Sequence, residues 1–253
     1  MRHLLVINPN TSASVSALLQ HHAQAAAGGE VRVTTRTARF GAPYISCEAS
    51  YTVAGHATLD TWAAALAEDG LAPPDAVLIG CFGDPGLLAL RESSPVPVTG
   101  LAEAAFIAAA AHGRFAIVTG GERWGPMLQR LALVLGQGPM LAGIHTVQPT
   151  GAQLAADPVA ARTLLAQACR DAARAFDVQA VILGGAGLAG MAAAIQHEVV
   201  VPVIDSVVAG THWALRAEAV ARQAPGFDVA WERVSAEMTA LGIQPASHRP
   251  LSA

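Results

Sequence analysis

The chain has 253 residues, of which 53% are hydrophobic and 13% charged, so it is long enough for a large core and is neither disordered nor fibrous. Its net charge of −4 offers no basic surface to a phosphate backbone, which argues against a nucleic-acid partner. All 15 basic residues are arginine, and the absence of lysine excludes Schiff-base chemistry and pyridoxal phosphate.

The N-terminus shows no apolar run followed by a cleavage site, and the most apolar tract, residues 104–111, is too short to span a bilayer. We therefore expect a cytoplasmic protein without a membrane partner. Its three cysteines form neither an even set nor a CxxC pair, which argues against disulfides and a structural zinc site. Four tryptophans and a high alanine content are compatible with helix contacts between subunits, and so with a homo-oligomer.

Short apolar runs alternate with alanine-rich segments of helical length, the βαβα pattern of a parallel sheet covered by helices. The expected strands are residues 3–9, 31–37, 75–81, 96–100, 114–120, 143–148, 180–185 and 201–205. The second four repeat the first four, because Ala76–Cys81 match Ala180–Gly185 at an offset of 104 and Pro97–Val98 match Pro202–Val203 at 105. This repeat predicts an α/β fold of two similar subdomains, with the carboxyl ends of both sheets facing a common cleft.

We place the two halves at residues 1–113 and 114–224, followed by a C-terminal region at residues 225–253. The segment 227–242 is predicted to form one more amphipathic helix, and residues 246–253 are expected to fray.

Cys81 follows an apolar strand, and the turn after it leads into a helix. A thiol at a helix N-terminus has a lowered pKa, which would make Cys81 a base or a nucleophile, whereas the alternative is a buried structural cysteine. Cys169 shares a helical face with Leu165 and Phe176 and is expected in the core. Cys47 lies in a loop before the second helix and has no evident role.

The motif "INPNTS" ends the first strand with Asn8 and Asn10, whose amides can orient a carbonyl or carboxylate. The equivalent motif of the second half, "VTGGERW", contributes Thr119 and the backbone amides of its glycines. Phe82 and Tyr44 are candidates to line an apolar pocket. The predicted substrate-binding residues are therefore Asn8, Asn10, Phe82, Gly83, Thr119, Gly120, Gly185, Ala186 and Gly187.

The stretch "GAGLAG", from Gly185 to Gly190, also fits a dinucleotide-binding fingerprint, with Asp205 twenty positions after its first glycine. A lone GxGxxG carries little information, and this one follows the third strand of a half instead of opening a Rossmann unit. The internal repeat explains the same glycines without a cofactor.

Three motifs, "INPNTS", "GCFGDPGL" and "LGGAGLAG" followed by "PVID", resemble the aspartate/glutamate/hydantoin racemase superfamily, most closely its hydantoin and allantoin racemase branch. The resemblance covers nearly the whole chain. It implies a pseudo-twofold pair of subdomains, each a four-stranded parallel sheet flanked by helices, and an active site between them. It also implies cofactor-independent chemistry, in which one cysteine removes a proton α to a carbonyl and a second returns it on the opposite face.

Carried over by position, Cys81 matches the first family cysteine, but Gly185 stands where the second is expected. A glycine holds no proton, so racemisation of a small hydantoin-like or amino-acid-like carbon acid needs another acid. Cys47, Asp84 and Asp205 are candidates on position alone.

Two other functions stay open. The superfamily includes arylmalonate decarboxylases with a single cysteine in the second half, so this chain resembles their mirror arrangement, and Cys81 could serve a decarboxylase, a lyase or a covalent-adduct isomerase. The last alternative is a non-catalytic protein that binds a small carboxylate or hydantoin.

Overall fold

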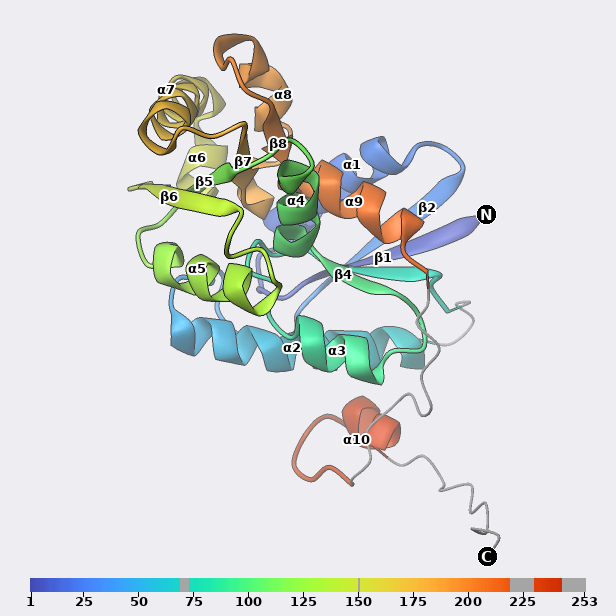
Figure 1. The fold of residues 1–253 in the computed structure, drawn as a ribbon. Helices are drawn as coiled ribbons and strands as arrows, with labels where there is room; N and C mark the ends of the chain where they lie inside the picture. The colour runs from blue at the N-terminus through green and yellow to red at the C-terminus, as the bar shows by residue number, and fades with distance from the viewer. Residues whose placement is uncertain (69–72, 150, 219–229, 243–253) are drawn as a thin grey trace, which may run out of the picture.

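The computed structural model describes residues 1–68, 73–149, 151–218 and 230–242 and contains two four-stranded parallel sheets (Figure 1). The strands of the first sheet lie in the order β2-β1-β3-β4 and those of the second in the order β6-β5-β7-β8, so the repeat in sequence is a repeat in topology. The strands are β1 (Arg2–Asn8), β2 (Val31–Thr37), β3 (Ala76–Ile79), β4 (Val98–Gly100), β5 (Phe115–Gly120), β6 (Leu141–Val147), β7 (Ala180–Gly184) and β8 (Val203–Asp205).

The eight expected strands are confirmed, as is the α/β class. The central strands are the most apolar: every residue of β3 and β7 is buried, as parallel strands covered on both faces require. The helices are α1 (Ala13–Ala27), α2 (Glu48–Ala67), α3 (Leu87–Ser93), α4 (Leu101–Ala110), α5 (Trp124–Val134), α6 (Gly151–Ala156), α7 (Pro158–Phe176), α8 (Met191–Ile195), α9 (Ser206–Arg216) and α10 (Ala236–Gly242), with 3-10 turns η1 (Ala186–Leu188) and η2 (Gln196–Glu198).

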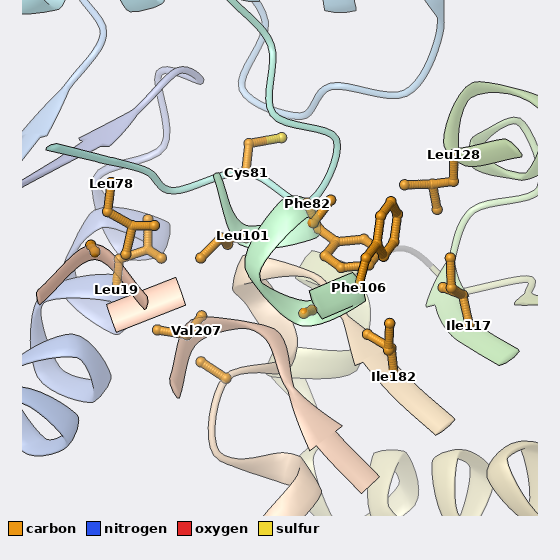
Figure 2. Packing of buried hydrophobic residues seen from close by; sticks show 14 of the residues in the cluster. Leu19, Leu78, Cys81, Phe82, Leu101, Phe106, Ile117, Leu128, Ile182 and Val207 are labelled. Atoms are coloured by element: carbon orange, nitrogen blue, oxygen red, sulfur yellow. The ribbon is translucent and has the colours of Figure 1, made fainter. Parts of the chain in front are cut away.

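Two helices cross from one half to the other. Helix α4 follows β4 of the first sheet but packs against β7 of the second, and α9 follows β8 of the second sheet but packs against β3 and β4 of the first. Leu101 and Phe106 of α4 and Val207 of α9 belong to one cluster with Leu78 of β3 and Ile182 of β7 (Figure 2). This shared core fixes the two sheets relative to each other, and with them the strand ends that form the site.

The C-terminal helix is shorter than the sequence predicts. Residues 230–235 form no helix, Arg233 has a left-handed φ of 59°, and α10 begins only at Ala236. The Ser235 hydroxyl accepts a hydrogen bond from the Met238 amide, which caps the helix there. Residues 227–229 and 246–253 lie outside the described part of the chain.

Helix α10 is held on α2 by an ion-pair network. The Arg39 guanidinium bonds the Asp60 carboxylate at 2.8 Å and the Glu237 carboxylate at 2.9 Å, and Met238 is fully buried below them. No helix among the described residues is long and apolar enough to cross a membrane, and residues 104–110 of the apolar tract lie within the core helix α4.

Candidate active site

A pocket of about 80 Å³ lies between the two halves, at the carboxyl ends of their central strands. A cavity needs about 10–15 Å³ to hold one water, so the pocket takes a small molecule of the size of a single ring. Eight of the predicted site residues line it: Asn10, Cys81, Phe82, Thr119, Gly120, Gly185, Ala186 and Gly187. Two stretches 104 residues apart in sequence thus meet at one cavity, as the repeat predicts.

Cys81 lies at the first-half side of the pocket, two residues past the end of β3, and is 8% exposed. The sequence predicts a lowered pKa from a helix N-terminus, and this prediction is wrong. Helix α3 begins only at Leu87, so no aligned helical amides face the sulfur. Burial instead raises the pKa of the Cys81 thiol, and the nearby Asp84 carboxylate raises it further. The resting side chain is a neutral thiol.

Asp84 does not line the pocket. Its carboxylate is 1% exposed and accepts hydrogen bonds from the backbone amides of Ala102 at 2.9 Å and Glu103 at 2.8 Å, which caps α4. Burial raises the pKa of Asp84 to about 7, against the opposing effect of these amides. Asp84 is therefore a helix cap and an electrostatic neighbour of Cys81.

Asp205 has the same role in the second half. Its carboxylate accepts hydrogen bonds from Val207 at 2.8 Å and Val208 at 3.1 Å, at the start of α9, and from Gly190 at 2.7 Å. These contacts occupy the group that the dinucleotide hypothesis assigns to a ribose, and the helix after "GAGLAG" has only five residues, Met191–Ile195. In the structure the glycines therefore form a tight turn, and Asp205 caps helix α9.

Cys47 lies at the N-cap of α2 and is partly exposed. Its sulfur lies 3.5 Å from the Ser50 hydroxyl, and a hydrogen bond from the Ser50 backbone lowers the pKa of Cys47. It does not line the pocket. Of the three side chains suggested as replacements for the second thiol, none reaches the cavity.

Asn8 and Asn10 have different positions relative to the pocket. Asn8 is fully buried behind the pocket, where its Nδ2 donates to the Asn10 Oδ1 at 3.0 Å and the Ser16 hydroxyl at 2.9 Å. The Asn10 Oδ1 also accepts from the Ser12 amide at 2.9 Å. Asn10 lines the pocket, and within the described residues no hydrogen bond uses its Nδ2. Asn8 positions the amide, and Asn10 offers the donor.

The second-half wall combines backbone groups and the Thr119 hydroxyl with the side chains of Trp124 and Leu188. The Thr119 hydroxyl donates to the Gly184 carbonyl at 2.8 Å, and the Gly185 amide donates to the Ser206 hydroxyl at 3.2 Å. In the described part of the chain, no backbone hydrogen bond is donated by the N–H groups of Ala186 and Gly187. This wall therefore offers hydrogen-bond donors to a ligand oxygen.

Gly185 leaves the expected place of the second thiol without a side chain. A Cβ there would lie 3.5 Å from Leu188 Cγ, in ordinary contact, so the space exists. The Gly185 φ of 144° is one that L-residues rarely adopt, so a side chain would strain the backbone.

Aromatic rings form the floor and one edge of the site. The Phe82 ring packs on Gly184, where a Cβ would lie 2.3 Å from it, and Figure 2 shows this ring against Phe106 of the core. Gly83 does not line the pocket, because it lies under Trp124, whose ring would be 2.4 Å from a Cβ there. Gly83 thus allows the indole to come close.

Several residues that line the pocket are absent from the predicted set, and Tyr44 is predicted only as an apolar lining residue. The missed residues include Ser12, Pro43, Ile45, Trp124 and Leu188. Trp124 had a usable signal, because it closes the motif "VTGGERW" at the end of β5. Among the described residues, no group of three or more histidine, cysteine or acidic side chains could hold a metal ion.

Comparison with known proteins agrees with this architecture. The model of the Asp/Glu/Hydantoin racemase family matches residues 4–214. A hydantoin racemase of Pseudomonas sp. (strain NS671) is 32% identical over 210 residues, which cover 83% of this chain and 83% of that protein. A hydantoin racemase of Paenarthrobacter aurescens is 33% identical over 211 residues, covering 81% and 86%.

Solved structures with the same fold include an allantoin racemase and an arylmalonate decarboxylase. The allantoin racemase of Klebsiella pneumoniae is similar with a TM-score of 0.80 and 31% identity, over 87% of this chain and 91% of that one. Unliganded arylmalonate decarboxylase shares the fold, with a TM-score of 0.59 and 19% identity over 89% of this chain and 97% of that one.

Proposed function

Because this chain belongs to the Asp/Glu/hydantoin racemase family and is therefore a racemase or isomerase, we propose that it racemises a small hydantoin-like ring, with Cys81 as one base. The observation that carries the proposal is the Cys81 thiol in a small pocket whose other wall presents backbone N–H donors. A thiolate and an oxyanion site are what proton abstraction α to a carbonyl requires.

The proposed reaction begins with a substrate carbonyl held by the Ala186 and Gly187 amides and the Asn10 Nδ2. The Cys81 thiolate takes the proton from the adjacent carbon, and the C–H electron pair moves into the carbonyl as an enolate. The N–H donors then bind an oxygen that has gained negative charge, which stabilises the transition state more than the ground state. Return of a proton on the opposite face gives the other enantiomer.

The charge of the pocket favours a neutral ring over an amino acid. Among the described residues that line it, none is arginine or histidine, and the chain has no lysine. A substrate carboxylate would thus have no cationic partner in the pocket. It would exchange its hydration shell for neutral hydrogen-bond donors only, which costs free energy. A hydantoin ring has carbonyls and N–H groups without a full charge, which suits these donors.

The raised pKa of Cys81 predicts an activity that increases with pH. The base is the thiolate, and burial keeps the thiol protonated near neutral pH, so each rise in pH increases the reactive fraction. Between pH 7.5 and 9.5 we expect kcat/KM to increase by up to about tenfold per pH unit. Initial rates on a resolved hydantoin would measure this. A rate independent of pH across the window would exclude a high-pKa thiol as the base.

Proton NMR in D2O tests the proposed function directly. The wild-type protein is incubated with resolved 5-substituted hydantoins, allantoin, aspartate, glutamate and an arylmalonate, against enzyme-free controls. We expect loss of the α-proton signal together with loss of optical rotation for a hydantoin. Loss of a carboxylate from the arylmalonate would favour a decarboxylase instead. Saturable binding of a hydantoin without exchange would favour a binding protein.

A further inference from the structure

Two side chains that line the pocket carry an ionisable proton. They are the Cys81 thiol and the Tyr44 phenol; the other described lining residues are apolar, amide or alcohol side chains and glycines. Racemisation needs one group on each face of the reacting carbon, and Gly185 supplies none. The three other candidates, Cys47, Asp84 and Asp205, lie outside the cavity. Besides Cys81, Tyr44 is therefore the remaining acid among the described residues that line it.

Tyr44 reaches across the cleft to the second-half wall. It comes from the segment between β2 and α2 of the first half, yet its hydroxyl donates to the Gly120 carbonyl of β5 at 3.3 Å. A Cβ on Gly121 would lie 2.8 Å from the same hydroxyl. Strand β5 is the neighbour of β7, with Thr119 paired to Gly184. The phenol therefore lies at the carboxyl end of β5, next to the strand that leads into Gly185, whereas Cys81 follows β3 of the other sheet.

We propose that Tyr44 is the second proton carrier of this site and takes the place of the thiol absent at Gly185. The inference rests on the racemase function proposed above. For one enantiomer, the Cys81 thiolate removes the α-proton and the electron pair enters the carbonyl. The Tyr44 O–H then protonates the other face, which leaves a thiol and a phenolate, and the opposite enantiomer reacts in the reverse order. Proton exchange with water resets the pair.

The environment of Tyr44 suits this role. Burial raises the pKa of Tyr44, a side-chain hydrogen bond with Trp124 opposes this shift, and the nearby Cys81 adds to it, so the phenol stays protonated and able to donate at neutral pH. Burial raises the pKa of Cys81 as well, so both groups rest in their protonated forms. The 3.3 Å hydrogen bond to Gly120 is long, and a substrate can replace it at little cost.

Replacement of Tyr44 by phenylalanine tests the inference with resolved enantiomers of a hydantoin that the wild type racemises. In D2O the Tyr44→Phe variant is expected to exchange the α-proton of one enantiomer only, because Cys81 takes and returns it on the same face. Inversion should fall at least about a hundredfold, as expected for loss of a general acid. The Cys81→Ala variant should show the mirror result, with slow exchange of the other enantiomer alone.

Tyr51→Phe is the matched control. The Tyr51 hydroxyl also donates to a backbone carbonyl, that of Gly83 at 2.8 Å, but Tyr51 does not line the pocket. This variant should invert and exchange both enantiomers. Inversion by Tyr44→Phe at the wild-type rate would overturn the inference. So would an equal loss of exchange for both enantiomers, since that is the signature of a merely structural role. A wild type without racemisation would instead refute the proposed function itself.

Discussion

Replacement of Cys81 by serine is expected to abolish racemisation and reduce kcat/KM by about a thousandfold or more, within the range of general acid–base catalysis. Serine has nearly the shape of cysteine, but its hydroxyl is a much weaker acid and does not form the base. The fold should be retained, because the exchange changes little volume and the side chain borders the pocket. Polarimetry on a resolved hydantoin measures the rate, and circular dichroism with thermal unfolding checks the fold.

The matched control is Cys47→Ser. Cys47 caps α2 from outside the pocket, and serine is a preferred N-cap residue, so this variant should fold and react like the wild type. Full activity in Cys81→Ser would remove the thiol from the mechanism, and with it both the racemase and the lone-cysteine hypotheses. Loss of activity in Cys47→Ser would return Cys47 to the list of acids that replace the second thiol.

The fold could be predicted from the sequence because its central strands are buried on both faces and because the strand pattern of the first half repeats in the second. The run Ala76–Ile79 and its counterpart Ala180–Gly184 are apolar throughout, which leaves few alternatives to a central parallel strand. The offset of 104 that aligns them also aligns Gly86 with Gly190. Both are N-cap residues of the next helix, with φ of 82° and 80°. Local pattern and the repeat were therefore sufficient to predict that Gly185 and Cys81 line one pocket.

The protonation states and contacts of the site residues could not be predicted from the sequence, because they depend on contacts between distant parts of the chain. The pKa of Cys81 follows from burial under a loop and from Asp84, whose own position is set by the amides of α4. No pattern near Tyr44 reveals that its hydroxyl reaches Gly120, 76 residues further along. The crossing of α4 and α9 is likewise a property of the packed core.

The two halves cap their crossing helices with carboxylates from different places. Asp205 caps α9 from the N-cap position itself. The equivalent residue before α4 is Gly100, where a Cβ would lie 2.0 Å from the Asp84 Cγ. The first-half loop thus carries both the reactive thiol and the carboxylate that caps α4, whereas the second-half loop carries neither a thiol nor a helix cap. Residues Gly185 to Gly187 therefore line the pocket mainly with backbone, so the asymmetry of the site extends beyond one missing thiol.

A thiol introduced at Gly185 should rescue inversion in the Tyr44→Phe variant. The double variant Tyr44→Phe/Gly185→Cys places an acid at the position where the family has its second cysteine, and the 3.5 Å distance from a Cβ to Leu188 leaves room for it. We expect at least a roughly tenfold recovery of inversion over Tyr44→Phe, a part of the 10²–10⁴ range for acid–base groups. Polarimetry and α-proton exchange with both enantiomers measure it.

The matched control for the rescue is Tyr44→Phe/Gly185→Ala. Alanine and cysteine carry the same backbone cost at a φ of 144°, about 1–3 kcal/mol of stability, but alanine has no proton to give. Equal recovery by alanine would show that the side chain at 185 acts by reshaping the pocket. A folded cysteine variant without recovery would mean that position 185 does not face the reacting carbon. Recovery by cysteine alone would indicate that this wall lacks a proton once the phenol is removed, because the backbone strain is the same in both variants.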